Sequence, residues 1–440
     1  MTDAWTSGDM SPELLKVAER AKRDPKGRFH SLAYLIDEGA LARAFHRLRK
    51  EAAVGVDGIT KEQYGQDLDE HLKDLHERLR AGRYRHQPIR RIHIPKDEGK
   101  TRPIGVSATS DKLVQGAIRE VLEAIYEQDF LSCSFGFRPG RGAHDAIRTL
   151  NRAVHAGEVN WILEADIRSF FDSIDRKQLL EMLKIRVADG SMLRLVGKCL
   201  HVGVLDGEEY SEPDLGTAQG SILSPLLGNI YLHYALDLWF EKEVRPRLRG
   251  KAILIRYADD YLIGFERKDD AERVMAVLPK RMSRYGLTLH PEKTRLLPFQ
   301  RPQGKEPGGG SATFDFLGFT LYWRKTLKGR WEMWCKTRHA RLTRAIRAVY
   351  DWCRDHRHWP VKEQHAALVR RLRGHYQYFG VNGNQRSVGT LEHMAKRAWF
   401  KWLRRRSQRT RLNWKRFTAL LGRLPLPRPR VHVRIWGANP

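Results

Sequence analysis

The chain of 440 residues contains 80 Lys and Arg against 52 Asp and Glu, which gives a formal net charge of +28. Hydrophobic residues make up 41% of the chain and aromatic residues 10%, so a sizeable core can form and an intrinsically disordered protein is excluded. The positive charge indicates a polyanionic partner. Because no apolar run approaches the length of a membrane-spanning helix, we favour nucleic acid over a membrane surface.

The cysteines and the N-terminus indicate the compartment. Cys133, Cys199, Cys335 and Cys353 are widely spaced, which argues against a Cys-x-x-Cys zinc site and is typical of reduced thiols. The first residues lack the basic and apolar segments of a secretory signal. We therefore expect a cytoplasmic protein of bacterial type.

Helices are predicted in the first part of the chain. Ser11, Pro12 and Glu13 supply a cap, a proline at the first helical position and an acid in the first turn. Apolar residues at helical spacing predict further helices over 38–53, 64–82 and 111–130.

Strands are predicted next. Residues 88–106 alternate apolar and basic side chains around an Asp-Glu-Gly-Lys turn, which predicts a β-hairpin with a cationic face. A long apolar helix is predicted over 221–244. The other strand-like ranges are 161–171, 251–265, 314–325 and 330–336.

The remainder of the chain is predicted to be helical and strongly basic. Ranges 341–353, 365–380 and 391–407 place apolar residues at helical spacing, and no acidic residue follows Glu392. The stretch 424–436 is punctuated by prolines and is expected to be extended.

Three aspartates stand at the ends of apolar strands. Asp259 and Asp260 are adjacent in one apolar hairpin, and Asp166 follows another apolar strand. An isolated Asp pair is usually a turn signal, because the side chain bonds its own backbone. Three convergent carboxylates would repel one another unless divalent cations lay between them. Two Mg²⁺ ions held in this way would suit an in-line phosphoryl transfer.

Several segments, in order, resemble the motifs of the reverse transcriptase core, and together they make chance agreement very small. They span roughly residues 88–323 and read IPKDEGKTRPIG, SFGFRPGRGAHDAI, ADIRSFFDSID, GTAQGSILSPLLGNIYL, YADD, GLTLHPEKT and FDFLGFTLYW. The set resembles bacterial group II intron-encoded proteins, which pair reverse transcription with maturase function. Many of these relatives continue into a His-Asn-His endonuclease domain; the sequence ends at Pro440 without that pattern, so no endonuclease is expected in it.

The resemblance implies an α+β fold. It is that of a right-hand polymerase, in which fingers and a palm with an antiparallel sheet are followed by an α-helical thumb. The implied segments are an N-terminal helical extension and fingers (1–87), reverse transcriptase fingers and palm (88–335), a helical thumb or maturase domain X (336–405) and a basic DNA-binding tail (406–440).

The resemblance also implies a metal site. Asp166, Asp259 and Asp260, with the backbone carbonyl of Ile167, would hold two Mg²⁺ ions. Asp260 would be the weakest of these ligands. Lys293 would protonate the departing pyrophosphate, although a lysine in such a turn is also compatible with a plain surface position.

Further residues are implied to bind the incoming nucleotide. Lys96 and Arg102 would pair with triphosphate oxygens; on their own they would read as an ordinary basic hairpin. Phe171 would be the steric gate that crowds a ribose 2′-hydroxyl, the alternative being a core phenylalanine. Gln219 would lie beside the incoming nucleotide, and Gly220 would allow close backbone approach.

The implied partners are intron RNA, target DNA with its primer, and dNTPs, which would place the protein at the nucleoid. The basic helices interleave cations with aromatic side chains that could stack on bases or fill a core: Tyr376, Tyr378, Trp399, Trp402 and Trp414. The core alternative is favoured for Trp399 and Trp402.

Three hypotheses follow. The first is an RNA-directed DNA polymerase that copies its intron RNA. The second is a maturase that acts mainly as an RNA-binding splicing factor. The third is a domesticated relative that serves DNA repair or phage defence. An intact aspartate triad favours retained polymerase chemistry, and an RNA-dependent RNA polymerase is disfavoured by the motifs.

Overall fold

The computed structural model describes residues 10–95, 101–213, 215–217, 219–303, 313–326, 328–407 and 410–436. The chain forms two compact units. The first consists of Met1–Gly142, Leu163–Ile263 and Asp269–Leu296, and the second of Ala143–Ile162, Gly264–Lys268 and Leu297–Pro440. The four functional segments expected from the sequence stay a prediction.

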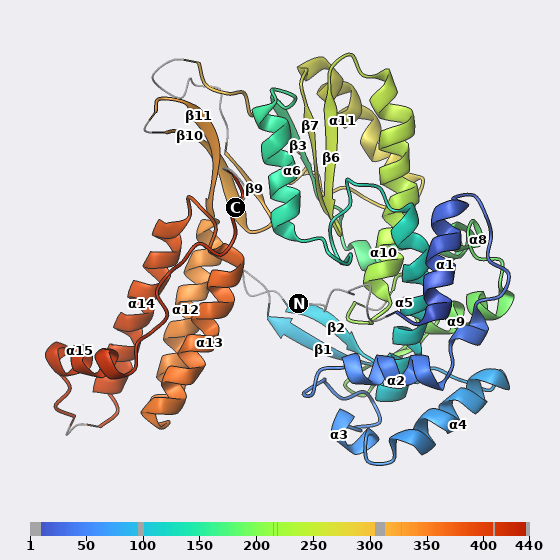
Figure 1. Cartoon of the computed structure of the whole chain (residues 1–440), viewed down its shortest axis with the longest axis horizontal. Coiled ribbons are helices and arrows are strands. Elements are labelled where there is room, and N and C mark those ends of the chain that lie inside the picture. Colours follow the sequence, from blue (N-terminus) through green and yellow to red (C-terminus); the bar gives the residue numbers. More distant parts are fainter. Residues whose placement is uncertain are drawn as a thin grey trace. The chain divides into compact units, whose positions relative to one another are not determined.

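The first unit begins with helices that pack on one buried helix. Ser11 caps α1 by accepting a hydrogen bond from the Leu14 amide (3.4 Å), as its sequence predicts. Both α1 and α2 contact α5, which is buried along most of its length (Figure 1). The helices are α1 (Pro12–Arg23), α2 (Glu38–Arg47), α3 (Lys61–Tyr64), α4 (Leu68–Arg80) and α5 (Thr109–Asp129).

Helix α2 ends earlier than its predicted limit at residue 53. Leu48 turns into extended backbone (ψ 139°), which stops the helix after Arg47. The Lys61 ammonium donates to the Leu48 carbonyl at 2.6 Å, so this carbonyl is satisfied without a further helical turn.

The predicted cationic hairpin is confirmed. β1 (Ile89–Pro95) pairs antiparallel with β2 (Thr101–Val106), in a register that places Ile94 opposite Arg102. These strands belong to a sheet of order β2-β1-β4-β5, in which β4 (Val204–Asp206) pairs with β1 and β5 (Glu209–Ser211) forms one edge.

A second sheet carries the predicted carboxylates. Its order is β6-β7-β3-β8. The strands are β3 (Trp161–Ala165), β6 (Ala252–Tyr257), β7 (Asp260–Phe265) and β8 (Arg295–Pro298). The helices between them are α7 (Phe170–Ser173), α8 (Arg176–Lys184), α9 (Gly190–Leu200), α10 (Ser224–Leu232) and α11 (Lys268–Ser283).

The long apolar helix predicted over 221–244 is present but irregular. Regular α-helix covers α10, and π-helical turns follow at His233–Asp237 and Phe240–Val244. Such turns are rare and occur often at functional sites. Here the first of them ends at Asp237, which is fully buried and ion-paired with Arg256.

Buried His233 makes the fold sensitive to acid. Burial lowers the pKa of His233 to about 4. The unfolded chain binds a proton near pH 6.5 and the folded chain only near 4, so stability falls as pH drops through this window. We expect His233 alone to cost about 2 kcal/mol at pH 5. Urea unfolding at pH 7 and pH 5 should show a smaller loss for His233→Gln than for the wild type; equal losses would contradict this assignment.

The second unit joins a small sheet to helices. Its sheet has the order β11-β10-β9, formed by β9 (Phe314–Phe316), β10 (Phe319–Lys325) and β11 (Trp331–Thr337). The predicted strand over 314–325 is therefore two strands, because Leu317 (φ 50°) and Gly318 (φ 79°) form a turn that pairs β9 antiparallel with β10. Helices α12, α13 and α14 contact one another in pairs and form the basic bundle seen in Figure 1. The helices are α6 (Ala143–His155), α12 (His339–Asp355), α13 (Val361–Phe379), α14 (Gln385–Arg404) and α15 (Trp414–Arg423).

The aromatic side chains of this bundle divide into core and surface. Trp399 and Tyr376 are buried, with Trp399 donating to the Gln364 side chain at 3.0 Å, so neither can stack on a base. Trp402 packs partly buried against the same core, while Trp414 is 51% exposed. The core alternative therefore holds for Trp399 and also for Tyr376, where the stacking alternative is wrong.

The predicted α+β class is confirmed, with the sheet-bearing segments followed by basic helices. Within the described residues, no helix has the length and apolar character that a membrane span requires.

Candidate active site

Two of the predicted carboxylates converge. Asp166 directly follows β3, half-buried Asp259 lies in the turn between β6 and β7, and exposed Asp260 begins β7. β3 and β7 are neighbours in the sheet. Burial raises the pKa of the Asp259 carboxyl, and the negative charge of Asp166 raises it further, while Arg102 lowers it. The charges of Asp166 and Arg102 therefore both act on the Asp259 carboxyl.

Lys293 lies against the same site. Its ammonium donates to Asp166 Oδ2 at 2.7 Å. The backbone supports this contact, because the His290 amide donates to the Asp166 carbonyl at 2.7 Å and Ile167 forms an antiparallel bridge with Leu289. The segment GLTLHPEKT is thus attached to the strand that ends in Asp166.

The cationic hairpin contacts the loop that carries Gln219 and Gly220, which is called the predicted nucleotide loop below. The Gly105 amide donates to the Gln219 carbonyl at 2.6 Å. Gly220 has φ +110°, and a Cβ there would lie 2.5 Å from the Gly105 carbonyl oxygen, so only glycine fits this approach. Lys96 lies outside the described residues.

Phe171 is the half-buried member of an aromatic pair. Phe170 is buried, and the two ring centroids are 5.2 Å apart. A Cβ at Gly228 of α10 would lie 3.0 Å from the Phe170 ring and 3.2 Å from the Phe171 ring. This packing holds Phe171 at the edge of the core, and its role as a gate stays a prediction.

The donor set fits a divalent cation. Carboxylate oxygens are the ligands that Mg²⁺ prefers, and the repulsion between Asp166 and Asp259 is of the kind that a cation relieves. In the described part of the chain, no three His, Cys, Asp or Glu side chains form a group able to hold one ion. The ligand set of Asp166, Ile167, Asp259 and Asp260 stays a prediction.

A buried arginine supports the turn that carries Asp259. Arg256, fully buried, forms a bidentate ion pair with Asp237 through Nε (2.8 Å) and Nη2 (2.6 Å). Its Nη1 donates to Asn229 Oδ1 (2.8 Å) and to the Ala258 carbonyl (3.0 Å). Ala258 has φ +59°, a left-handed conformation that is strained for alanine, one residue before Asp259. The Arg256 network therefore supports the backbone that positions Asp259.

The segment SFGFRPGRG completes this support. Ser134 Oγ accepts from Arg256 Nη2 at 2.9 Å, and the Gly136 carbonyl accepts from Asn229 Nδ2 at 2.7 Å. A Cβ at Gly136 would lie 2.3 Å from the Ala258 amide nitrogen, so the two backbones touch. Buried Arg138 is committed to the Glu127 carboxylate and to two backbone carbonyls. This segment therefore supports the Asp259 turn from inside the fold.

Gln115 of α5 supports the nucleotide loop in a similar way. Its Oε1 accepts from Ser221 Oγ (3.1 Å) and from the Ile222 amide (3.2 Å). Its Nε2 lies 2.8 Å from His86 Nε2 and donates to Ser107 Oγ (3.1 Å). Gln115 is fully buried, so the side chain uses its hydrogen-bonding capacity to fix the start of α10.

Sequence reasoning missed Arg256, Asp237, Asn229 and Gln115. The available signal was a charged residue inside each of two strongly apolar segments, Asp237 in 221–244 and Arg256 in 251–265, because buried charges require partners. The Arg256 position, directly before Tyr-Ala-Asp-Asp, was visible, but its partner on a separate helix was not.

Comparisons with known proteins agree with these motifs. The family described as "Reverse transcriptase (RNA-dependent DNA polymerase)" matches residues 94–321, more than half of the 440-residue chain. Protein YkfC of Escherichia coli (strain K12) is 32% identical over 280 residues, which cover 56% of this chain and 74% of YkfC.

Intron-encoded proteins are also similar. The group II intron-encoded protein LtrA of Lactococcus lactis subsp. cremoris is 36% identical over 222 residues, covering 49% of this chain and 37% of LtrA. The putative COX1/OXI3 intron 1 protein of Saccharomyces cerevisiae is 28% identical over 340 residues, covering 66% of this chain and 40% of that protein. The chain thus spans less than half the length of these two relatives.

Proposed function

Because the chain belongs to the reverse transcriptase (RNA-dependent DNA polymerase) family, we propose that it copies the RNA of a group II intron into DNA and binds that RNA as a maturase. The observation that carries the proposal is the convergence of Asp166 and Asp259 with the charges of Arg102 and Lys293. A paired carboxylate site flanked by cations suits transfer of a nucleotide from a triphosphate.

The predicted site residues have separate roles in the reaction: metal binding, triphosphate binding and proton donation. Reverse transcriptases use divalent metal, and two Mg²⁺ ions bound by Asp166, the Ile167 carbonyl, Asp259 and Asp260 would stabilise the attacking and leaving oxygens. Arg102, whose charge already acts on Asp259, pairs with the triphosphate together with Lys96. Lys293 donates to the Asp166 carboxylate. From this position it gives a proton to the departing pyrophosphate.

The nucleotide itself is held by the loop and the aromatic pair. Phe171 crowds the ribose 2′ position, Gln219 lies beside the nucleotide, and Gly220 permits close approach of the backbone. The partners are dNTPs, the intron RNA, and a target DNA with its primer, which places the work at the nucleoid in the cytoplasm. The basic tail from residue 406 binds that DNA.

Primer extension on an RNA template tests this function. The wild type should incorporate dNTPs and discriminate against NTPs. In Phe171→Ala the loss of the ring should reduce this discrimination roughly 10- to 100-fold, mainly through a lower KM for NTPs. The matched control is Phe170→Leu, which alters the buried ring of the same pair. Unchanged discrimination in Phe171→Ala would contradict the gate, and absence of RNA-templated dNTP incorporation by the wild type would contradict the function.

RNA binding is expected to depend steeply on salt. Exposed cations lie on α12, α13 and α14: Arg341, Arg344, Arg347, Arg370, Arg373, Arg397, Lys401 and Arg404. If six to ten of the protein's cations contact phosphate, affinity should fall about 10³- to 10⁵-fold between 50 and 200 mM salt. Arg344→Gln with Arg347→Gln should lower the slope of log K against log salt by about 2. Filter binding of intron RNA measures this slope, and a slope near zero would exclude the proposed surface.

A further inference from the structure

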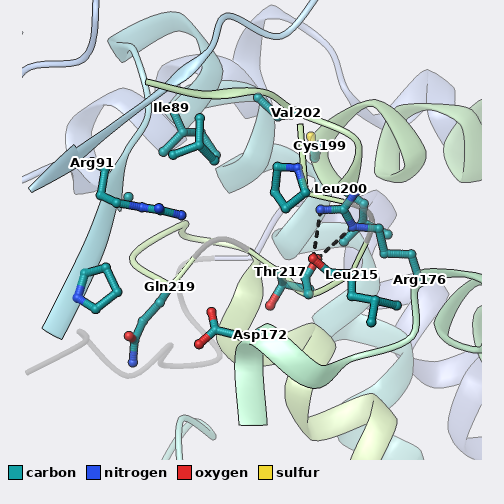
Figure 2. A pocket seen from close by; sticks show the side chains of 15 residues that line it. Ile89, Arg91, Asp172, Arg176, Cys199, Leu200, Val202, Leu215, Thr217 and Gln219 are labelled. Carbon is teal, nitrogen blue, oxygen red and sulfur yellow. Dashed lines mark hydrogen bonds between the residues drawn. The ribbon is translucent and has the colours of Figure 1, made fainter. Parts of the chain in front are cut away.

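A cavity of about 430 Å³ opens in the first unit beside the predicted nucleotide loop (Figure 2). Its walls come from β1, β2, β4, the end of α9, and the loop that leads to Gln219. Asp172, the residue after the predicted gate Phe171, also lines it. The cavity is therefore lined by three segments that the proposed reaction uses: β2, the residue after Phe171, and the loop that carries Gln219.

The lining combines apolar and polar side chains. Figure 2 shows Leu200, Leu215 and the buried Arg176 on one side, and Ile89, Arg91 and Gln219 on the other. The charge of Arg91 lowers the pKa of Asp172, which burial raises, so these two groups of the lining act on each other. Such a combination suits a flat ring with hydrogen-bonding groups along its edge.

One buried polar group in the lining lacks a partner. Thr217 is 4% exposed, and its hydroxyl finds no hydrogen-bond partner within the part of the chain that the structure describes. A buried hydroxyl without a partner costs free energy, and a ligand that bonds it recovers that free energy. Thr217 lines the cavity, which places the missing partner there.

Hydrogen bonds attach residues 215–217 to neighbouring segments. The Thr217 amide donates to the Phe171 carbonyl at 2.7 Å, and Arg176 donates to the carbonyls of Gly216 (2.8 Å) and Leu215 (3.2 Å). Gly216 has φ +84°, and a Cβ there would lie 2.8 Å from Asp172 Cα. Residues held in this way favour binding, because they require little ordering when a ligand arrives.

Resting on the proposed function, we propose that this cavity receives an unpaired base of the template strand, the one next to the templating nucleotide. A base enclosed by walls on several sides cannot at the same time pair with a second base. The incoming nucleotide and the templating base pair with each other, so they are excluded as occupants. The next template base is unpaired, and it offers flat apolar faces and a polar edge that the lining complements.

Binding to two primer–template duplexes tests the proposal without requiring catalysis. In one duplex the template extends one nucleotide beyond the primer, and in the other it extends two. In the absence of dNTPs and metal, the wild type should bind the longer overhang more tightly. Thr217→Val should lower that preference about three- to tenfold, the loss of one hydrogen bond. The matched control is Thr109→Val, since Thr109 is 3% exposed but its hydroxyl donates to the Ile59 carbonyl outside the cavity.

A modified template gives a second measurement on the unmodified protein. An abasic second nucleotide should reduce wild-type affinity to that for the shorter overhang. Equal weakening of both duplexes by Thr217→Val, or full affinity for the abasic template, would overturn the assignment. Overhang preference without any primer extension would instead refute the proposed polymerase while leaving the base site intact.

Discussion

Asp259→Ala should abolish DNA synthesis on an RNA template while leaving the affinity for intron RNA unchanged. Asp259 is the half-buried carboxylate whose pKa is raised by burial and by the charge of Asp166, so it is the group with most to gain from a bound cation. Losing such a ligand should lower kcat at least about a thousandfold, the equivalent of about 4 kcal/mol.

The companion variants set an order of effects. Asp166→Asn should match Asp259→Ala, because each removes one member of the converging pair. Asp260→Asn should lose less, since Asp260 is exposed at the start of β7 and was expected to be the weakest ligand. Asp355→Ala, at an exposed carboxylate paired with Arg354 in the second unit, is the control and should retain full activity.

The measurement separates chemistry from RNA binding. Primer extension over a Mg²⁺ titration reports the first, and filter binding of intron RNA reports the second. If Asp259→Ala retained synthesis, the metal assignment would fall. If it lost RNA affinity as well, the loss of synthesis would reflect a damaged fold, and near-ultraviolet circular dichroism would show that damage.

Local sequence patterns were sufficient to predict several elements of the fold and two residues of the candidate site. The hairpin of β1 and β2 followed from strict alternation around a turn, and the Asp166 and Asp259 positions followed from apolar strands that end in acids. These signals lie within single elements, where the period of the backbone fixes which side chains share a face.

What the sequence left hidden depends on tertiary contacts. The Tyr376 ring sits at helical spacing beside arginines, yet it points into the bundle and is buried. The π-helical turn at His233–Asp237 has no sequence pattern of its own, because its reason is a partner, Arg256, on a strand. The cavity at Thr217 likewise arises from segments that lie far apart in the chain.

The Arg256–Asp237 ion pair should be the costliest polar contact to break. Both side chains are fully buried, and Arg256 makes every one of its donors available to Asp237, Asn229, Ser134 and the Ala258 carbonyl. Asp237→Ala leaves the arginine charge buried without its counter-ion. Chemical denaturation should show a loss of about 3–5 kcal/mol in the free energy of unfolding.

Replacing both partners distinguishes stability from positioning. Arg256→Met combined with Asp237→Leu removes both charges and keeps apolar volume, so it should recover most of the lost stability. It cannot restore the hydrogen bond from Arg256 to the Ala258 carbonyl, which holds the strained residue before Asp259. We therefore expect the double variant to fold stably yet show a kcat reduced about tenfold or more, with KM for dNTPs little changed. Recovery of kcat together with stability would mean that Arg256 serves the core alone.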